Sequence, residues 1–92
     1  MNFTHYNLGF LAAGTIVTVT LSGTEANVKL LDESNFHAYK TRARHHYTGG
    51  HYRRSPAVLS VPNDGTWHVV VDLGGFVGNV RSGVQVRRPV RT

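Results

Sequence analysis

The sequence predicts an all-β fold: a small antiparallel β-sandwich of jelly-roll type, or a flattened barrel, with at most one short helical turn. Two observations support this prediction. Short segments rich in valine and threonine alternate between apolar and polar positions. Clusters of glycine, proline, asparagine and aspartate separate them roughly every eight to twelve residues. The 92 residues suffice for one domain, expected over residues 1–88, with residues 89–92 as a basic tail or the start of a linker.

Three strands are predicted in the first third of the chain. Phe3–Tyr6 is a short first strand, and Asn7-Leu8-Gly9 begins the connection that follows it. Thr15–Leu21 is the clearest strand, because its apolar residues alternate with threonine. A turn at Ser22-Gly23-Thr24 leads to the strand Ala26–Asp32, whose asparagine and lysine are expected to point outward.

Three further strands are predicted after residue 56: Ala57–Val61, Thr66–Leu73 and Asn79–Arg87. Pro62–Gly65 is expected to be a turn, because proline has no N–H to donate and Asn-Asp-Gly tolerates positive φ. Gly74–Gly78 is also expected to be a turn, since its glycine spacing differs from that of a dinucleotide-binding loop and no helix follows it. The residues expected in the core are Val17, Val19, Val28, Leu30, Leu59, Trp67, Val69, Val71 and Val84.

The segment from His37 to Arg54 has an unusual composition. It contains four of the six histidines, five of the ten Lys and Arg residues and three of the four tyrosines, and it has no acid. Phe36–Lys40 can form one helical turn at its start. The Gly49-Gly50 pair between two alternating runs predicts a hairpin turn. In this register Tyr47 and Tyr52 stack on one face, and His46, His51 and Arg53 lie on the other. The alternative is a long irregular loop.

The charge of the chain favours an anionic partner. The formal net charge is +5 and the sequence pI is about 10.3. We therefore expect a non-enzymatic binding or sensing module that recognises an anionic small molecule, a nucleotide, a nucleic acid or an acidic partner. Arginine holds phosphate with two parallel hydrogen bonds, and tyrosine rings stack on bases. The candidate ligand-binding residues are Tyr39, Lys40, Arg42, Arg44, His46, Tyr47, His51, Tyr52, Arg53 and Arg54.

Two alternatives stay open. The first is a protein-interaction or self-assembly domain that uses sheet edges and the tyrosine face. The second is a small hydrolase or metal-dependent enzyme that uses the histidines His37, His45, His46 and His51. The neighbouring arginines repel a cation, and no serine lies in a G-x-S-x-G context. We therefore assign no catalytic residue, no metal ligand and no cofactor, and enzymatic activity is not favoured.

A cytoplasmic location is expected from the composition. The chain has no cysteine, whereas small secreted domains commonly depend on disulfides. Its N-terminal residues lack the basic start and long apolar run of a signal peptide. No apolar run approaches the length of a membrane span, so no membrane association is expected. The composition leaves the oligomeric state undefined.

Three stretches together resemble a known family: VKLLDESNFHAYK, HHYTGGHYRRSP and LSVPNDGTWHVVVDLGG. The family is a small bacterial one, known only as a domain of unknown function that occurs alone or fused to TIR domains. The resemblance covers nearly the whole chain and implies a compact, mostly β domain with a recognition or sensing role. It implies no catalytic residues. A weaker similarity to jelly-roll modules rests on the strand ending in Leu-Leu-Asp and on the late Gly-x-Trp-x-Val strand.

Overall fold

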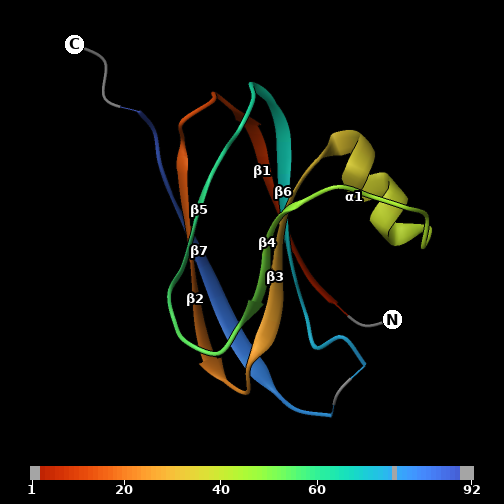
Figure 1. The fold of residues 1–92 in the computed structure, drawn as a ribbon. Helices are drawn as coiled ribbons and strands as arrows, with labels where there is room; N and C mark the ends of the chain where they lie inside the picture. Colours follow the sequence, from red (N-terminus) through yellow and green to blue (C-terminus); the bar gives the residue numbers. More distant parts are fainter. Residues whose placement is uncertain (1–2, 76, 90–92) are drawn as a thin grey trace.

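The computed structural model describes residues 3–75 and 77–89 (Figure 1). Within these residues the chain forms strands and one helix, as the sequence predicts, and no helix is long and apolar enough to cross a membrane. The tail expected at residues 89–92 lies almost entirely outside the described residues. In chain order the elements are β1 (Phe3–Leu11), β2 (Ile16–Gly23), β3 (Ala26–Asp32), α1 (Glu33–Lys40), β4 (Thr48–Tyr52), β5 (Ala57–Ser60), β6 (Gly65–Asp72) and β7 (Val80–Arg87).

The strands form two antiparallel sheets that pack face to face. One sheet has the order β1-β6-β3-β4, and the other has the order β5-β2-β7. Every connection between consecutive strands crosses from one sheet to the other, except the one from β3 to β4. Helix α1 lies on the outer face of the four-stranded sheet (Figure 1). The predicted all-β sandwich is therefore confirmed, and the helix forms a partial third layer.

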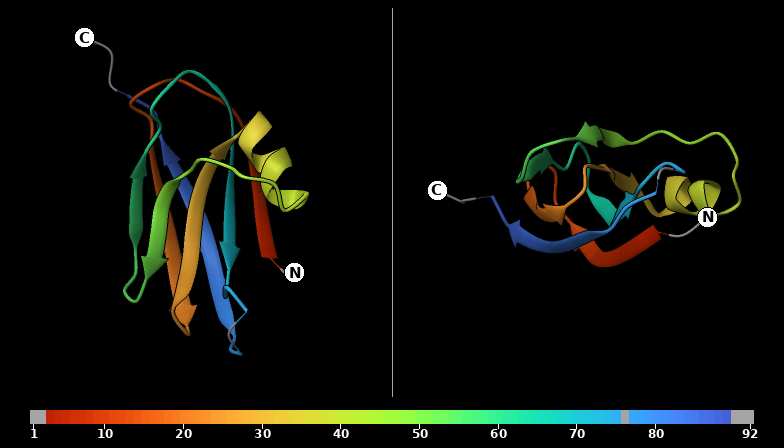
Figure 2. Two further views of the ribbon diagram at one scale, coloured as in Figure 1. Left: turned by 45° about the vertical axis from the view of Figure 1, so that its right-hand side comes forward. Right: turned by 90° about the horizontal axis from the view of Figure 1, so that it is seen from below.

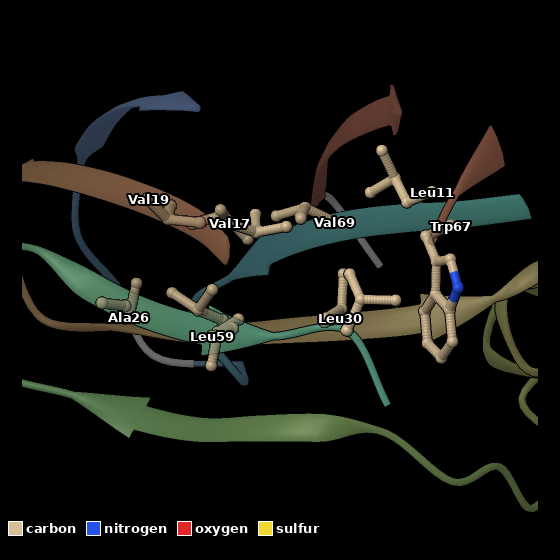
Figure 3. Close-up of a cluster of buried hydrophobic side chains, with 12 residues drawn as sticks. Leu11, Val17, Val19, Ala26, Leu30, Leu59, Trp67 and Val69 are labelled. Atoms are coloured by element: carbon tan, nitrogen blue, oxygen red, sulfur yellow. The ribbon is translucent and has the colours of Figure 1, made fainter. Parts of the chain in front are cut away.

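The main core fills the space between the two sheets (Figure 3). Alternate residues of each strand point inward, as the sequence pattern predicts. Trp67 is buried, and its indole Nε1–H donates to the carbonyl of Asn63 at 2.9 Å. All the predicted core residues are buried except Val84, which packs against the core but stays partly exposed. Val84 lies on the edge strand β7, which has a neighbouring strand on only one side.

A second apolar cluster lies outside the sandwich, between the four-stranded sheet and α1. Phe36 and Tyr39 of the helix pack there on Leu31 and Val70, with Phe3 at the margin. Both faces of β6 are consequently buried between Trp67 and Asp72. The helix is longer than the single turn predicted, because Asp32 caps it: the carboxylate accepts from the backbone N–H of Asn35 at 2.9 Å.

The first strand is also longer than predicted. It continues past Tyr6 to Leu11, and its pairing with β6 shifts register between Asn7 and Gly9. The Asn7 side chain accepts from the N–H of Gly9 at 3.0 Å. The Asn-Leu-Gly sequence is therefore a bulge within the strand, whereas its residues predict a connection.

The predicted hairpin at Gly49-Gly50 is wrong. Both glycines lie inside β4, which pairs along β3 with Gly49 opposite Lys29 and Gly50 opposite Val28. Gly49 has a φ of 131°, and a side chain there would collide with the carbonyl oxygen of Val28. Gly49 therefore permits β4 to approach β3 closely. In the sequence alone, a glycine needed for such an approach cannot be distinguished from a glycine in a hairpin turn.

Candidate functional site

Polar side chains from the strands of the four-stranded sheet converge on its outer face. The strand registers place His5, Val70, Lys29 and Gly49 in one row across the sheet, and Phe3, Asp72, Asn27 and His51 in the next. Helix α1 covers only part of this face, and residues 41–47 run from its end back to β4 (Figure 2). A groove of about 550 Å³ remains beside the helix, lined by Asn27, Lys29, Tyr39, Arg42, Ala43, His45, Asp72, Gly74 and Gly75.

The floor of this groove is a buried carboxylate with three donors. Asp72 is only 4% exposed. It accepts from the Tyr39 hydroxyl at 2.6 Å, and from the Asn27 side-chain amide and the Gly74 N–H at 2.9 Å each. Burial, together with the hydrogen bond and the charge of Asp72, raises the pKa of Tyr39 above its ordinary value of 10.0. The phenol therefore stays protonated and anchors α1 to the sheet.

Lys29 is held on the wall of the groove by aromatic rings and a histidine. Its Nζ lies 5.0 Å from the centre of the Tyr39 ring and 4.7 Å from that of Tyr47. The same Nζ is 3.4 Å from Nε2 of His45. Because the carbonyl of Ala43 only accepts, the 3.0 Å contact of His45 Nδ1 with it requires a proton on Nδ1. Nε2 of a neutral His45 is then the acceptor for Lys29.

Arg42 reaches the groove from an unusual backbone position. The end of α1 is a Schellman motif: the N–H of Ala43 donates to the carbonyl of Ala38 at 2.8 Å, and that of Arg42 to Tyr39 at 3.2 Å. The residue after the C-cap Thr41 adopts a left-handed conformation in this motif, and glycine is usual there. Here it is Arg42, with a φ of 60°. Non-glycine residues in such conformations concentrate at functional sites.

The structure separates the ten predicted binding residues. Tyr39 and Arg42 line the groove, and Tyr47 borders it through its contact with Lys29. Tyr52 instead packs against the main core opposite Ala26. The remaining six are on exposed positions around the helix and β4: Lys40, Arg44, His46, His51, Arg53 and Arg54.

The segment His37–Arg54 contains no acidic residue, but the fold brings Glu25 into contact with it. Glu25 lies 3.0 Å from Nε2 of His51 and 3.5 Å from Nε of Arg53. His51 also contacts Asn27 at 3.0 Å. These two predicted residues therefore form a separate, partly exposed cluster of three side chains with Glu25. By contrast, neither Lys29 nor Arg42 forms an ion pair with a carboxylate of residues 3–75 or 77–89.

Most residues of the groove are not among those that the sequence predicts to bind a ligand. Asn27, Lys29 and Asp72 come from strands in which the sequence predicts no ligand-binding residue, although the alternation places Asn27 and Lys29 on an outward face. The sequence indicates His45 only as a metal ligand or a base, whereas the structure places it in the groove beside Lys29. In the described part of the chain, no three His, Asp or Glu side chains converge as metal ligands would. The chain has no cysteine.

A family model described as a domain of unknown function (DUF1883) matches residues 1–90. No curated protein and no solved structure matches the chain.

Proposed function

The chain belongs to the DUF1883 family of domains of unknown function, and on this premise we propose that it is a non-enzymatic binding module that takes an anionic ligand in the groove beside α1. One observation carries the proposal. Lys29, Arg42 and His45 converge on a single groove from β3, the end of α1 and the loop that follows. Neither Lys29 nor Arg42 has a carboxylate partner among the described residues. Even with the Asp72 carboxylate at the floor of the groove, Lys29 and Arg42 leave a net positive charge there, which an anion would neutralise.

The dimensions of the groove favour a small anion. Its volume of about 550 Å³ falls within the range of small-molecule sites. The exposed ring of Tyr47 at its border can stack on a planar base, and the guanidinium of Arg42 can hold a phosphate with two hydrogen bonds. A nucleotide or a phosphosugar therefore fits better than a long nucleic acid, whose backbone would need a continuous basic track.

A binding screen with matched variants tests this proposal. We would titrate ATP, a phosphosugar, short RNA and short DNA into the protein at low salt by calorimetry. Lys29→Gln and Arg42→Gln should each weaken binding about tenfold to a hundredfold, because a hydrogen bond to a charged group contributes about 1.5–3 kcal/mol. Arg54→Gln is the control: it removes the same charge from an exposed arginine outside the groove. The proposal fails if wild type binds none of these probes, or if Arg54→Gln weakens binding as much as Arg42→Gln.

A second candidate function is self-assembly, and one surface feature favours it. Phe10 is 64% exposed, and beside it lies a hollow lined by Phe10, Leu11, Ala12, Thr15, Arg88 and Pro89. A large exposed aromatic side chain next to an apolar hollow is typical of an interaction surface. Light scattering would then show a dimer that persists at high salt and is lost in Phe10→Ser. A monomer in wild type would remove this candidate.

Two broader proposals concern the setting of the domain. The lack of cysteine supports a cytoplasmic location, because disulfides are common in small secreted domains. The TIR association implied by the family resemblance supports a sensing role, in which an occupied groove would report the presence of a small anion.

A further inference from the structure

His45 is held in the groove so that only one of its ring nitrogens can gain or lose a proton. Its Nδ1 lies 3.0 Å from the carbonyl of Ala43, which only accepts, so Nδ1 carries a proton in the neutral and the charged ring alike. The ring packs against those of Tyr39 and Tyr47, with ring centres 5.4 Å and 5.7 Å away. The atom left to titrate is Nε2, which lies 3.4 Å from Nζ of Lys29.

Without an anion, the contact with Lys29 favours the neutral form of His45. The lysine ammonium only donates, so Nε2 has to offer its lone pair in this hydrogen bond. A proton on Nε2 would remove the bond and place two positive charges side by side, with Arg42 in the same groove.

A bound anion reverses this preference. Because Nζ and Nε2 are 3.4 Å apart, hydrogen bonds of about 2.8 Å from both nitrogens can meet at one anionic oxygen. Nε2 donates to that oxygen only if it carries a proton, whereas its lone pair would repel the anion. The bond from Nδ1 to Ala43 is the same in both forms, so His45 can take up the proton without turning its ring.

The charges around His45 support the same conclusion. Lys29 and Arg42 disfavour a further positive charge, and Asp72 favours it from the floor of the groove. Asp72 does not take the place of the anion, because it is buried and already accepts three hydrogen bonds. An anion offsets the two cations, and the protonated form of His45 is then favoured. The charged or titratable side chains that face or flank His45 are Lys29 from β3, Tyr39 from α1, Asp72 from β6, and Arg42, Arg44, His46 and Tyr47 from the segment between α1 and β4.

We propose that anion binding in the groove is coupled to the uptake of one proton at Nε2 of His45. The affinity for the anion therefore rises as the pH falls through the range of about pH 8 to 5 in which histidines change charge. This coupling rests on the proposed function of the groove and adds a means of regulation to it: the module holds its ligand in mildly acidic conditions and releases it in alkaline ones.

Inorganic sulfate is the probe that isolates the coupling. A phosphate group titrates near neutral pH and can bring its own proton to Nε2, whereas sulfate carries none in this range. Sulfate is titrated at about pH 6 and about pH 8 and at constant ionic strength, with the amide NMR signals of Gly74 and Gly75 in the groove as reporters. Wild type should bind at least about fivefold more tightly at the lower pH, against a limit of about tenfold per pH unit for one proton.

Two glutamine variants separate His45 from the general charge of the protein. In His45→Gln the amide oxygen can still accept from Lys29 but the side chain takes up no proton, so the affinity should differ less than about twofold between the two pH values. His46→Gln is the matched control: it changes the next residue, which is exposed and outside the groove, and should retain the pH dependence of wild type.

The ring nitrogens of His45 in wild type give a second measurement that needs no variant. Nitrogen NMR at about pH 8 should show a proton on Nδ1 alone without sulfate, and saturating sulfate at about pH 6 should place protons on both nitrogens. A proton on Nε2 of the neutral ring would overturn the coupling, as would equal pH dependence in wild type and His45→Gln. Sulfate binding that is independent of pH would overturn the coupling but leave the groove as an anion site. Absence of sulfate binding at both pH values would also overturn the coupling, and the ATP and phosphosugar titrations then decide the groove separately.

Discussion

Replacement of Arg42 by glycine should increase the stability of the fold while it weakens the binding of an anion in the groove. In its left-handed conformation, a non-glycine residue costs roughly 1–2 kcal/mol. Arg42→Gly removes this strain but adds freedom to the unfolded chain, worth about 0.4–1 kcal/mol. These two terms leave a net stabilisation of about 0–1.6 kcal/mol, with a central value of about 0.8 kcal/mol, or about 3–6 °C in Tm for a domain of this size. Both the glycine and an alanine variant should lose anion affinity equally, because neither has a guanidinium.

The alanine variant is the matched control for this experiment. Arg42→Ala removes the same charge but keeps a Cβ in the left-handed conformation, so its stability should stay within about 0.5 kcal/mol of wild type. Urea unfolding at neutral pH, followed by tryptophan fluorescence of Trp67, gives both free energies of unfolding. If Arg42→Gly is no more stable than Arg42→Ala, the cap is not strained. The reasoning that Arg42 occupies this position against its conformational preference would then be refuted.

Two further predictions concern the strand glycines and the groove floor. Gly49→Ala should reduce the free energy of unfolding by about 2–4 kcal/mol, because the new Cβ would collide with the carbonyl oxygen of Val28. Gly50→Ala is the control and should be neutral or slightly stabilising, since there is open space at its Cβ. If chemical denaturation gave equal free energies of unfolding for the two variants, the pairing of β4 with β3 would be contradicted. Tyr39→Phe should cost about 1–3 kcal/mol because it leaves an oxygen of buried Asp72 without its donor. Since the pKa of Tyr39 is raised in the folded state, the stability that it contributes is present below pH 10.0 and is lost as the pH rises above it. A spectrophotometric titration in which every tyrosine ionises together near that pH would argue against the Tyr39–Asp72 bond.

The main core was predictable because each of its strands carries its own pattern. Val17 and Val19 on β2, and Trp67, Val69 and Val71 on β6, alternate with other residues and are buried as the period of two requires. The helix was only partly predictable. The residues Phe36–Lys40 predict one helical turn, and the capping role of Asp32 adds a turn before it.

The candidate site was predicted only at Tyr39, Arg42 and Tyr47. The other predicted cations are dispersed, because the Gly49-Gly50 pair lies in a strand and β4 pairs with β3. That pairing carries His51 and Arg53 to Glu25 and leaves Lys29 beside the end of α1. In the sequence, Asp72 is only one polar residue in an apolar strand. Its role becomes visible in the fold, where Tyr39 and Asn27 donate hydrogen bonds to it.

The amino-acid sequence by itself determined β2, β3, β5, β6, β7 and the start of β1, their inward faces and the basic character of the chain, because alternation and charge are local properties. Only the tertiary structure decided which strands are neighbours. Strand order depends on contacts between residues far apart in the chain, such as β1 with β6 and β3 with both β4 and β6. The groove and the Lys29–His45 contact within it arise from that order, because each joins side chains that no local pattern connects.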